Sequence, residues 1–93
     1  MQETNRVIVT VLGKDRVGII AGVANILSEA DVNIVDISQT IMQEFFTMIM
    51  VVDISDSHIG FNELKAKLEE KGDELGVKIT VQHEKVFDFM HRI

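Results

Sequence analysis

The stretch "GKDRVGIIAGVANIL", residues 13–27, decides the fold because it takes the chain out of a strand and into a helix. The preceding residues, 6–12, read RVIVTVL, which is β-branched and apolar on both faces, as in a central strand. Apolar residues then recur at helical spacing from Val17 to Ala30. Their stripe is wider than the sheet beneath would need, so we expect this helix to touch a second surface as well.

The rest of the chain contains four more periodic segments. They are a strand over 34–41, a strand over 45–54, a helix over 61–75 and a strand over 77–82. We expect the residues 55–57, Ser-Asp-Ser, to cap the second helix and Gly76 to end it.

The resulting order is strand, helix, strand, strand, helix, strand. It predicts an α+β, ferredoxin-like βαββαβ sandwich, in which one four-stranded antiparallel sheet carries both helices on one face. Strands one and three should be central. We expect one domain over 1–93, with a core over about 6–86 and a short extension, 87–93, that folds as a covering helix.

Composition narrows the function classes. The chain has 93 residues and is 46% hydrophobic, so its core is small and a partner subunit is expected to cover apolar surface. It has no cysteine, which excludes disulfides and thiolate chemistry. A net charge of −6 argues against nucleic acid as a partner. No apolar run reaches the ~18 residues of a membrane span, and the polar start is unlike a signal sequence, which indicates a cytoplasmic protein.

The two edge strands differ in how they are protected. The fourth strand carries Lys78 and is followed by Glu84 and Lys85, whereas the segment Val32–Ile41 has only Asp36. Unprotected edges tend to be paired or covered. We therefore expect a homodimer in which the strand within Val32–Ile41 meets its own copy.

The glycines of the opening stretch do not form a known phosphate motif. Gly13 and Gly18 have the separation of a Walker loop, but Ile19 and Ile20 stand where Lys and Ser or Thr are needed. The spacing of Gly13, Gly18 and Gly22 also fails the dinucleotide fingerprint.

No catalytic or metal-binding set is evident either. The histidines, at 58, 83 and 91, are scattered, and we interpret them as surface residues. Glu84, Asp88 and His91 would share a face of a helical tail, a spacing that arises often on solvated surfaces. We expect no catalytic residue, no metal and no cofactor.

What remains is a turn that opens a helix. Free amides in the first helical turn attract a small anion such as a carboxylate. Gly18 allows close approach to the backbone, Asp15 suits an ammonium group, and Asn33, expected at the same end of the sheet, can donate and accept. Together these groups would bind an α-amino acid.

Each of these residues also has a structural interpretation. Asp15 would cap the helix, and Asn33 would be a left-handed turn residue. Gly18 and Gly22 would permit tight packing of the helix on the sheet. Lys14 and Arg16 would be solvated loop charges.

The stretch "GKDRVGIIAGVANILSEADVNIVDISQT" resembles the ACT domain family, small regulatory modules that bind amino acids. The family's turn is commonly D-R-P-G-[IVL], followed by a helix and a V-N-I strand start, and Val17 stands here in place of the proline. The likeness covers about Val7 to Val86. "DISQT" and the "MHRI" end are most similar to small single-ACT proteins related to the ACT halves of the glycine cleavage system transcriptional repressor.

The resemblance implies a ligand site shared between two subunits. It assigns the polar ligand positions to Asp15 and Asn33 and the glycine of the turn to Gly18. The ligand-binding residues it implies are Asp15, Arg16, Val17, Gly18, Ile19, Asn33 and Ile34.

Three functions follow as hypotheses. The first is a non-enzymatic module that senses a small amino acid as a homodimer and docks on a larger protein. The second is an interaction domain whose ligand site has been lost. The third is a hydrolase of acylphosphatase type, a class with the same element order, in which Arg16 and Asn33 would act on substrate.

Overall fold

A computed structural model describes residues 5–14 and 18–85 of the chain. Its six elements follow the predicted order. They are β1 (Arg6–Gly13), α1 (Ile19–Glu29), β2 (Asn33–Met42), β3 (Phe45–Asp53), α2 (Phe61–Leu75) and β4 (Lys78–His83). The expected extension, 87–93, lies outside the described residues.

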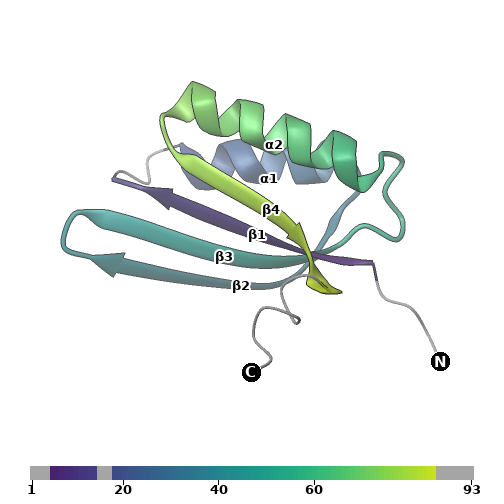
Figure 1. Ribbon diagram of the computed structural model, residues 1–93, viewed down its shortest axis with the longest axis horizontal. Coiled ribbons are helices and arrows are strands. Elements are labelled where there is room, and N and C mark those ends of the chain that lie inside the picture. Colours follow the sequence, from purple (N-terminus) through teal and green to yellow (C-terminus); the bar gives the residue numbers. More distant parts are fainter. Residues whose placement is uncertain (1–4, 15–17, 86–93) are drawn as a thin grey trace.

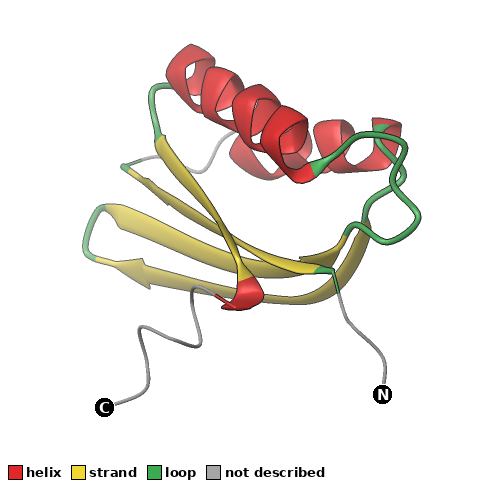
Figure 2. Ribbon diagram, turned by 45° about the vertical axis from the view of Figure 1, so that its right-hand side comes forward, coloured by secondary structure: helices red, strands yellow, loops and turns green. Residues whose placement is uncertain are grey.

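The four strands form one antiparallel sheet in the order β2-β3-β1-β4. Both helices lie on the same side of this sheet (Figures 1 and 2). The predicted ferredoxin-like fold is therefore confirmed, with β1 and β3 in the centre and β2 and β4 at the edges.

The core lies between the helices and three of the four strands. Alternate residues of β1, β3 and β4 point toward the helices and are buried, as period-two strands require. The buried apolar residues include Val7, Val9, Val11, Ile19, Val23, Leu27, Phe46, Met48, Met50, Val52, Leu64, Leu68, Ile79 and Val81. β2 contributes none of them, and all ten of its residues are exposed.

The face of the sheet away from the helices also carries exposed apolar residues. Leu12, Phe45 and Ile49 lie on this face and expose 50%, 44% and 40% of their surface. We name this surface the open face of the sheet.

The residues that cap the N-termini of both helices differ from the predicted ones. α1 begins two residues later than expected, with Gly18 at its N-cap. α2 has the predicted bounds and ends at Gly76 in a left-handed conformation, but its N-cap is Gly60 and no side chain caps it. Ser57 instead shapes the preceding loop, where its Oγ accepts the Ile59 N–H at 3.1 Å.

Two glycines allow close packing of the helices. The expectation that Gly22 packs on the sheet is wrong, because a Cβ there would meet Leu75 and Lys71 of α2. Gly72 packs on the strand side of α2: its carbonyl accepts the Val77 N–H at 2.9 Å, and a Cβ would lie 2.9 Å from the Val77 carbonyl oxygen.

We therefore predict that Gly72→Ala destabilises the domain although alanine favours helices. The added methyl meets a backbone carbonyl that cannot rotate away, and overpacking of this kind costs about 1–3 kcal/mol. Thermal unfolding should show a midpoint lowered by at least about 4 °C. Gly22→Ala is the control, because the atoms it meets belong to flexible side-chain ends and α1 gains helix propensity. Equal midpoints for the two variants would contradict this account.

Candidate functional site

The N-terminus of α1 forms a backbone donor site at the end of β1. Gly18 has φ 79°, in the left-handed region, and no side chain caps the helix within the described residues. The Gly22 N–H donates to the Gly18 carbonyl at 2.9 Å, which makes it the first amide of the helical ladder. The amides of residues 18–21 precede this bond and have no partner within the helix. They favour negative charge, as does the helix dipole.

The space beside Gly18 is open. A Cβ built on Gly18 would meet no heavy atom within 4 Å. Tight packing therefore does not explain this glycine. The left-handed conformation does, and it also leaves the backbone accessible.

Other predicted site residues of this turn have different placements. Asp15, Arg16 and Val17 lie outside the described residues. The Ile19 side chain is buried in the core with 1% of its surface exposed. Ile19 can therefore present only its backbone amide to a ligand.

Asn33 and Ile34 open β2, but at the far end of the sheet. Asn33 lies opposite Asp53, which lies opposite Arg6 at the start of β1. The turn before Gly18 instead follows Gly13, at the other end of β1. The expectation that Asn33 and the turn share one end of the sheet is wrong, since an eight-residue strand separates the two ends by roughly 24 Å.

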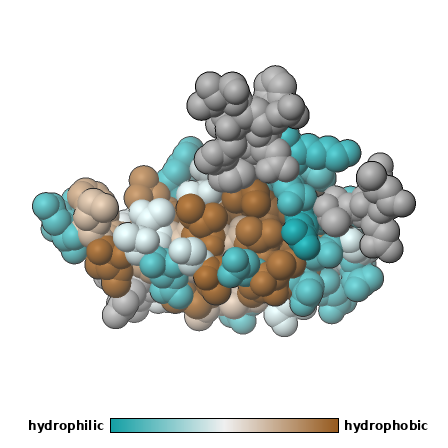
Figure 3. Space-filling view, turned by 90° about the horizontal axis from the view of Figure 1, so that it is seen from below, coloured by the Kyte–Doolittle hydropathy of each residue, from teal (hydrophilic) through white to brown (hydrophobic). Residues whose placement is uncertain are grey.

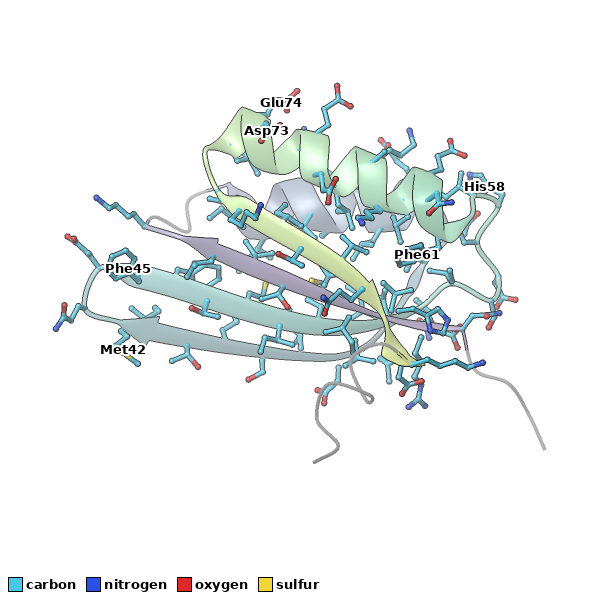
Figure 4. The ribbon with its side chains drawn as sticks, viewed as in Figure 1. Met42, Phe45, His58, Phe61, Asp73 and Glu74 are labelled. Atoms are coloured by element: carbon cyan, nitrogen blue, oxygen red, sulfur yellow. The ribbon has the colours of Figure 1, made fainter. Side chains whose placement is uncertain are left out.

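Asn33 is not the left-handed turn residue either. That conformation belongs to Asp31, with φ 60°. The Asp31 carboxylate lies 3.2 Å from His58 Nδ1. The loop before α2 therefore contacts the turn that leads into β2. Figure 4 shows His58 at this end of the molecule and Met42 and Phe45 at the opposite end.

Asp53, the strand partner of Asn33, has a perturbed carboxyl group. Hydrogen bonds from the Ser55 side chain and backbone, the latter at 2.8 Å, together with the charge of Arg6, lower the pKa of Asp53 from its usual 3.8. The pKa of Asp53 is lower in the folded than in the unfolded chain. The ionised Asp53 carboxylate therefore stabilises the fold above the unfolded pKa, and this contribution is lost as the pH falls through the folded pKa.

The helix side of β2 carries an apolar row that the sequence analysis did not single out. Ile34, Ile37 and Ile41 oppose residues of β3 that are buried under the helices, yet each exposes at least 41% of its surface. Ile20 of α1 is 40% exposed. The wide apolar stripe of α1 was the sequence feature that could have indicated this exposed row, because it predicted that α1 contacts a second surface beyond the sheet.

A hollow of about 520 Å³ lies between α1 and α2, away from the predicted site. Carboxylates and lysines line it over an apolar base, and among them Lys71 Nζ contacts Glu74 Oε1 at 2.8 Å. This contact, with the charges of Glu29 and Glu70, raises the pKa of Lys71. The four glutamates of the lining, at positions 29, 63, 70 and 74, outnumber its two lysines, Lys67 and Lys71.

The described residues contain no group of three metal-binding side chains. Asp88 and His91, which with Glu84 formed the weak metal candidate, lie outside the described part of the chain. Among the described helices, none combines the length and the apolar character needed to cross a membrane.

These features define a class of protein: a ferredoxin-like domain with a backbone donor site at its first helix and an unpaired second strand. A family model for the ACT domain matches residues 5–82. The chain belongs to the ACT domain family. The family resemblance read from the opening stretch is thereby confirmed.

Individual relatives agree. The chain is 55% identical over 89 residues to the UPF0237 protein MJ1558 of Methanocaldococcus jannaschii, with 96% of this chain and 99% of the relative covered. A solved ACT domain protein from Streptococcus pneumoniae is 44% identical, with a TM-score of 0.79 and with 91% of this chain and 96% of that one covered. A putative glycine cleavage system transcriptional repressor shares the fold, with a TM-score of 0.75 at 24% identity over 88% of this chain and 47% of its own.

We predict that Gly18→Ala destabilises the domain although open space surrounds the residue. The left-handed conformation costs a residue with a Cβ about 1–2 kcal/mol, whereas asparagine tolerates it better. Gly18→Asn is therefore the control, and its thermal midpoint should lie between those of the wild type and Gly18→Ala. If Gly18→Ala unfolds at the wild-type temperature, the left-handed conformation at this turn is contradicted.

Proposed function

We propose that this ACT domain is a non-enzymatic regulatory module that binds a small amino acid at a homodimer interface. The supporting observation is that Gly18 at the α1 N-terminus and Asn33 at the start of β2 lie at opposite ends of the sheet, and that β2 is an edge strand that pairs only with β3 among the described strands. One copy cannot close such a site, but two copies can.

Pairing of β2 with β2 of a second copy would bring Asn33 of one copy beside the α1 N-terminus of the other. A two-fold axis makes equal strands run antiparallel, so the first residue of one strand lies beside the last residues of the other. The partner subunit's Asn33 then lies level with Ile41 of the first copy, at the end where Gly13 leads to Gly18. Each dimer gains two equivalent sites.

The apolar row on β2 supports this pairing. Ile34, Ile37 and Ile41 lie on the helix side, where the described helices leave at least 41% of the surface of each exposed. Edge pairing extends the sheet and brings the partner's α1 over the same region, and the exposed Ile20 lies on that helix. Burial of these side chains stabilises the dimer at about 25 cal/mol for each Å² removed from water.

The chemistry of the site suits an α-amino acid. The amides of residues 18–21, which have no partner within the helix, donate to the ligand carboxylate. Asp15 provides a negative charge for the ammonium group, and the partner subunit's Asn33 offers both a donor and an acceptor. Because these groups come from two chains, ligand binding stabilises the dimer, and this linkage can signal to a larger protein.

A hydrolase of acylphosphatase type receives no support from the placement of Asn33. The turn that contains Arg16 connects Gly13 to Gly18, and Asn33 lies at the other end of the sheet. The two side chains therefore cannot act on one substrate within a single chain. An interaction domain that has lost its ligand site would still form the dimer. The ligand experiment below distinguishes this alternative from our proposal.

We predict that Ile37→Lys converts the dimer into a monomer. Two copies of the new lysine would lie near the two-fold axis, where like charges in a desolvated interface repel. Ile37 is 41% exposed, so the variant should keep its fold by circular dichroism. Ala66→Lys, on the exposed side of α2, is the control for the change in charge. Light scattering that finds a monomeric wild type at tens of micromolar would overturn edge pairing.

We also predict that one or a few of the twenty amino acids raise the thermal midpoint of the wild type. A ligand at 100 times its dissociation constant stabilises by about 2.7 kcal/mol, or roughly 10–20 °C for a domain of this size. The shift should disappear in Asp15→Ala and in Asn33→Ala and persist in Asn62→Ala, a matched change on exposed α2. A panel without any shift would favour the interaction domain.

Mixing the two inactive variants tests the shared site directly. In a mixed dimer, one site carries both substitutions, while the other joins an intact Asp15 to an intact Asn33. Co-refolded Asp15→Ala and Asn33→Ala chains should therefore recover ligand binding that neither variant has alone. No recovery, with mixed dimers verified by mass spectrometry, would refute the bridging arrangement.

A further inference from the structure

Asp36 is the only charged residue of β2, and it lies within this edge strand. The ladder between β2 and β3 is irregular between Ile34 and Asp36, so Ile34 opposes Val52 whereas Asp36 opposes Val51. Val52 is buried under the helices and Val51 points the other way, which places the Asp36 side chain on the open face. Figure 3 views the molecule from this side and shows hydrophobic residues gathered in its middle, with hydrophilic residues between and around them.

The Asp36 carboxylate binds a backbone donor of its own strand. The Ile37 N–H donates to Asp36 Oδ1 at 2.8 Å. Alternate residues of an edge strand direct their N–H and C=O groups away from the neighbouring strand. Ile37 is one of these residues, because its N–H is donated to a side chain and not to β3. Asp36 therefore satisfies a donor on the free edge of the sheet.

The same donor lies at the two-fold axis of the proposed dimer. When Asn33 lies level with Ile41 of the partner subunit, Ile37 lies opposite Ile37 of the partner subunit. Two residues that direct their backbone groups toward each other form reciprocal N–H···O=C bonds. Each Ile37 N–H would exchange the charged oxygen of Asp36 for a neutral carbonyl, and hydrogen bonds to a charged acceptor are the stronger kind. Pairing therefore competes with the Asp36 contact.

Pairing also brings carboxylates together. In the same register, the two Asp36 side chains are diagonal neighbours across the axis, about 7–8 Å apart. Asp53, on the same face of β3, adds a second carboxylate in each chain, while neither β2 nor β3 contains a lysine or an arginine. The partner subunit's Ser38, which lies level with Asp36, offers only a neutral hydroxyl. Like charges without compensation weaken a β pairing.

We propose that Asp36 regulates the self-association of this domain. Its carboxylate competes with the second copy for the Ile37 N–H and repels its own copy across the two-fold axis. This inference rests on the proposed edge pairing and names a residue that opposes it. The isoleucines of β2 favour the dimer and Asp36 weakens it, so a ligand that contacts both chains shifts the balance toward assembly.

The dimer dissociation constant tests the inference, measured by sedimentation velocity of the full chain over a dilution series. Asp36→Ala removes both the competing oxygen and the charge, and it should lower this constant about tenfold or more. Asp36→Asn removes the charge but keeps an acceptor oxygen, so its constant should lie between those of Asp36→Ala and the wild type. Circular dichroism checks that each variant is folded.

Asp73→Ala is the matched control. It removes the same charge from an exposed position of α2, which lies away from β2 (Figure 4), and should leave the dissociation constant within about twofold of the wild type. Raising the salt concentration screens the repulsion between carboxylates. The dissociation constants of the wild type and of Asp73→Ala should therefore fall with salt more steeply than that of Asp36→Ala.

The outcomes distinguish this inference from the edge pairing on which it rests. A wild-type dimer that Ile37→Lys dissociates, with an unchanged or raised constant in Asp36→Ala, would overturn the role of Asp36 and retain edge pairing. An equal decrease of the constant in Asp36→Ala and Asp73→Ala would reduce the effect to net charge and also overturn that role. If the wild type and Asp36→Ala both remain monomeric at tens of micromolar, edge pairing itself is refuted and the inference with it.

Discussion

Two helices on one side of a four-stranded sheet are the constraint on which the rest of this structure depends. Their buried residues reach over β1, β3 and β4, so β2 contributes nothing to the core formed by the described residues. The 26 helical residues cover three of the four strands, which leaves the helix side of β2 exposed. In the proposed dimer, a second copy covers this side of β2.

The same constraint explains why a ligand site would lie between subunits. A strand that lacks both a neighbour and a helix cover supplies backbone edge groups and apolar side chains to a partner. In the proposed dimer a two-fold axis inverts the strand, so Asn33 at the start of β2 lies beside the partner's helix N-terminus at the opposite end. Separation within one chain and proximity across the dimer are thus two consequences of one topology.

The sequence predicted the fold well because the period of the apolar residues reports the face that is buried. Val77 to Gln82 alternate as a half-exposed strand, and 61–75 repeats as a helix. Cap positions were predicted less well, since Ser57 and Gly60 both suit the start of α2 and only the loop path decides between them. Asn33 lies beside the start of β1 because β1 and β2 both pair antiparallel with β3, as the predicted order already requires, and therefore start at the same end of the sheet.

β3 is apolar on both faces, but only one of its faces is buried. Phe45 to Ile54 indicated a central strand, and β3 is central. In a sheet with helices on both sides, such a strand would be fully buried. Here only Phe46, Met48, Met50 and Val52 are buried, while Ile49 lies 40% exposed on the open face. A doubly apolar strand in a two-layer fold therefore marks both a central position in the sheet and an exposed apolar surface on the side that the helices leave uncovered.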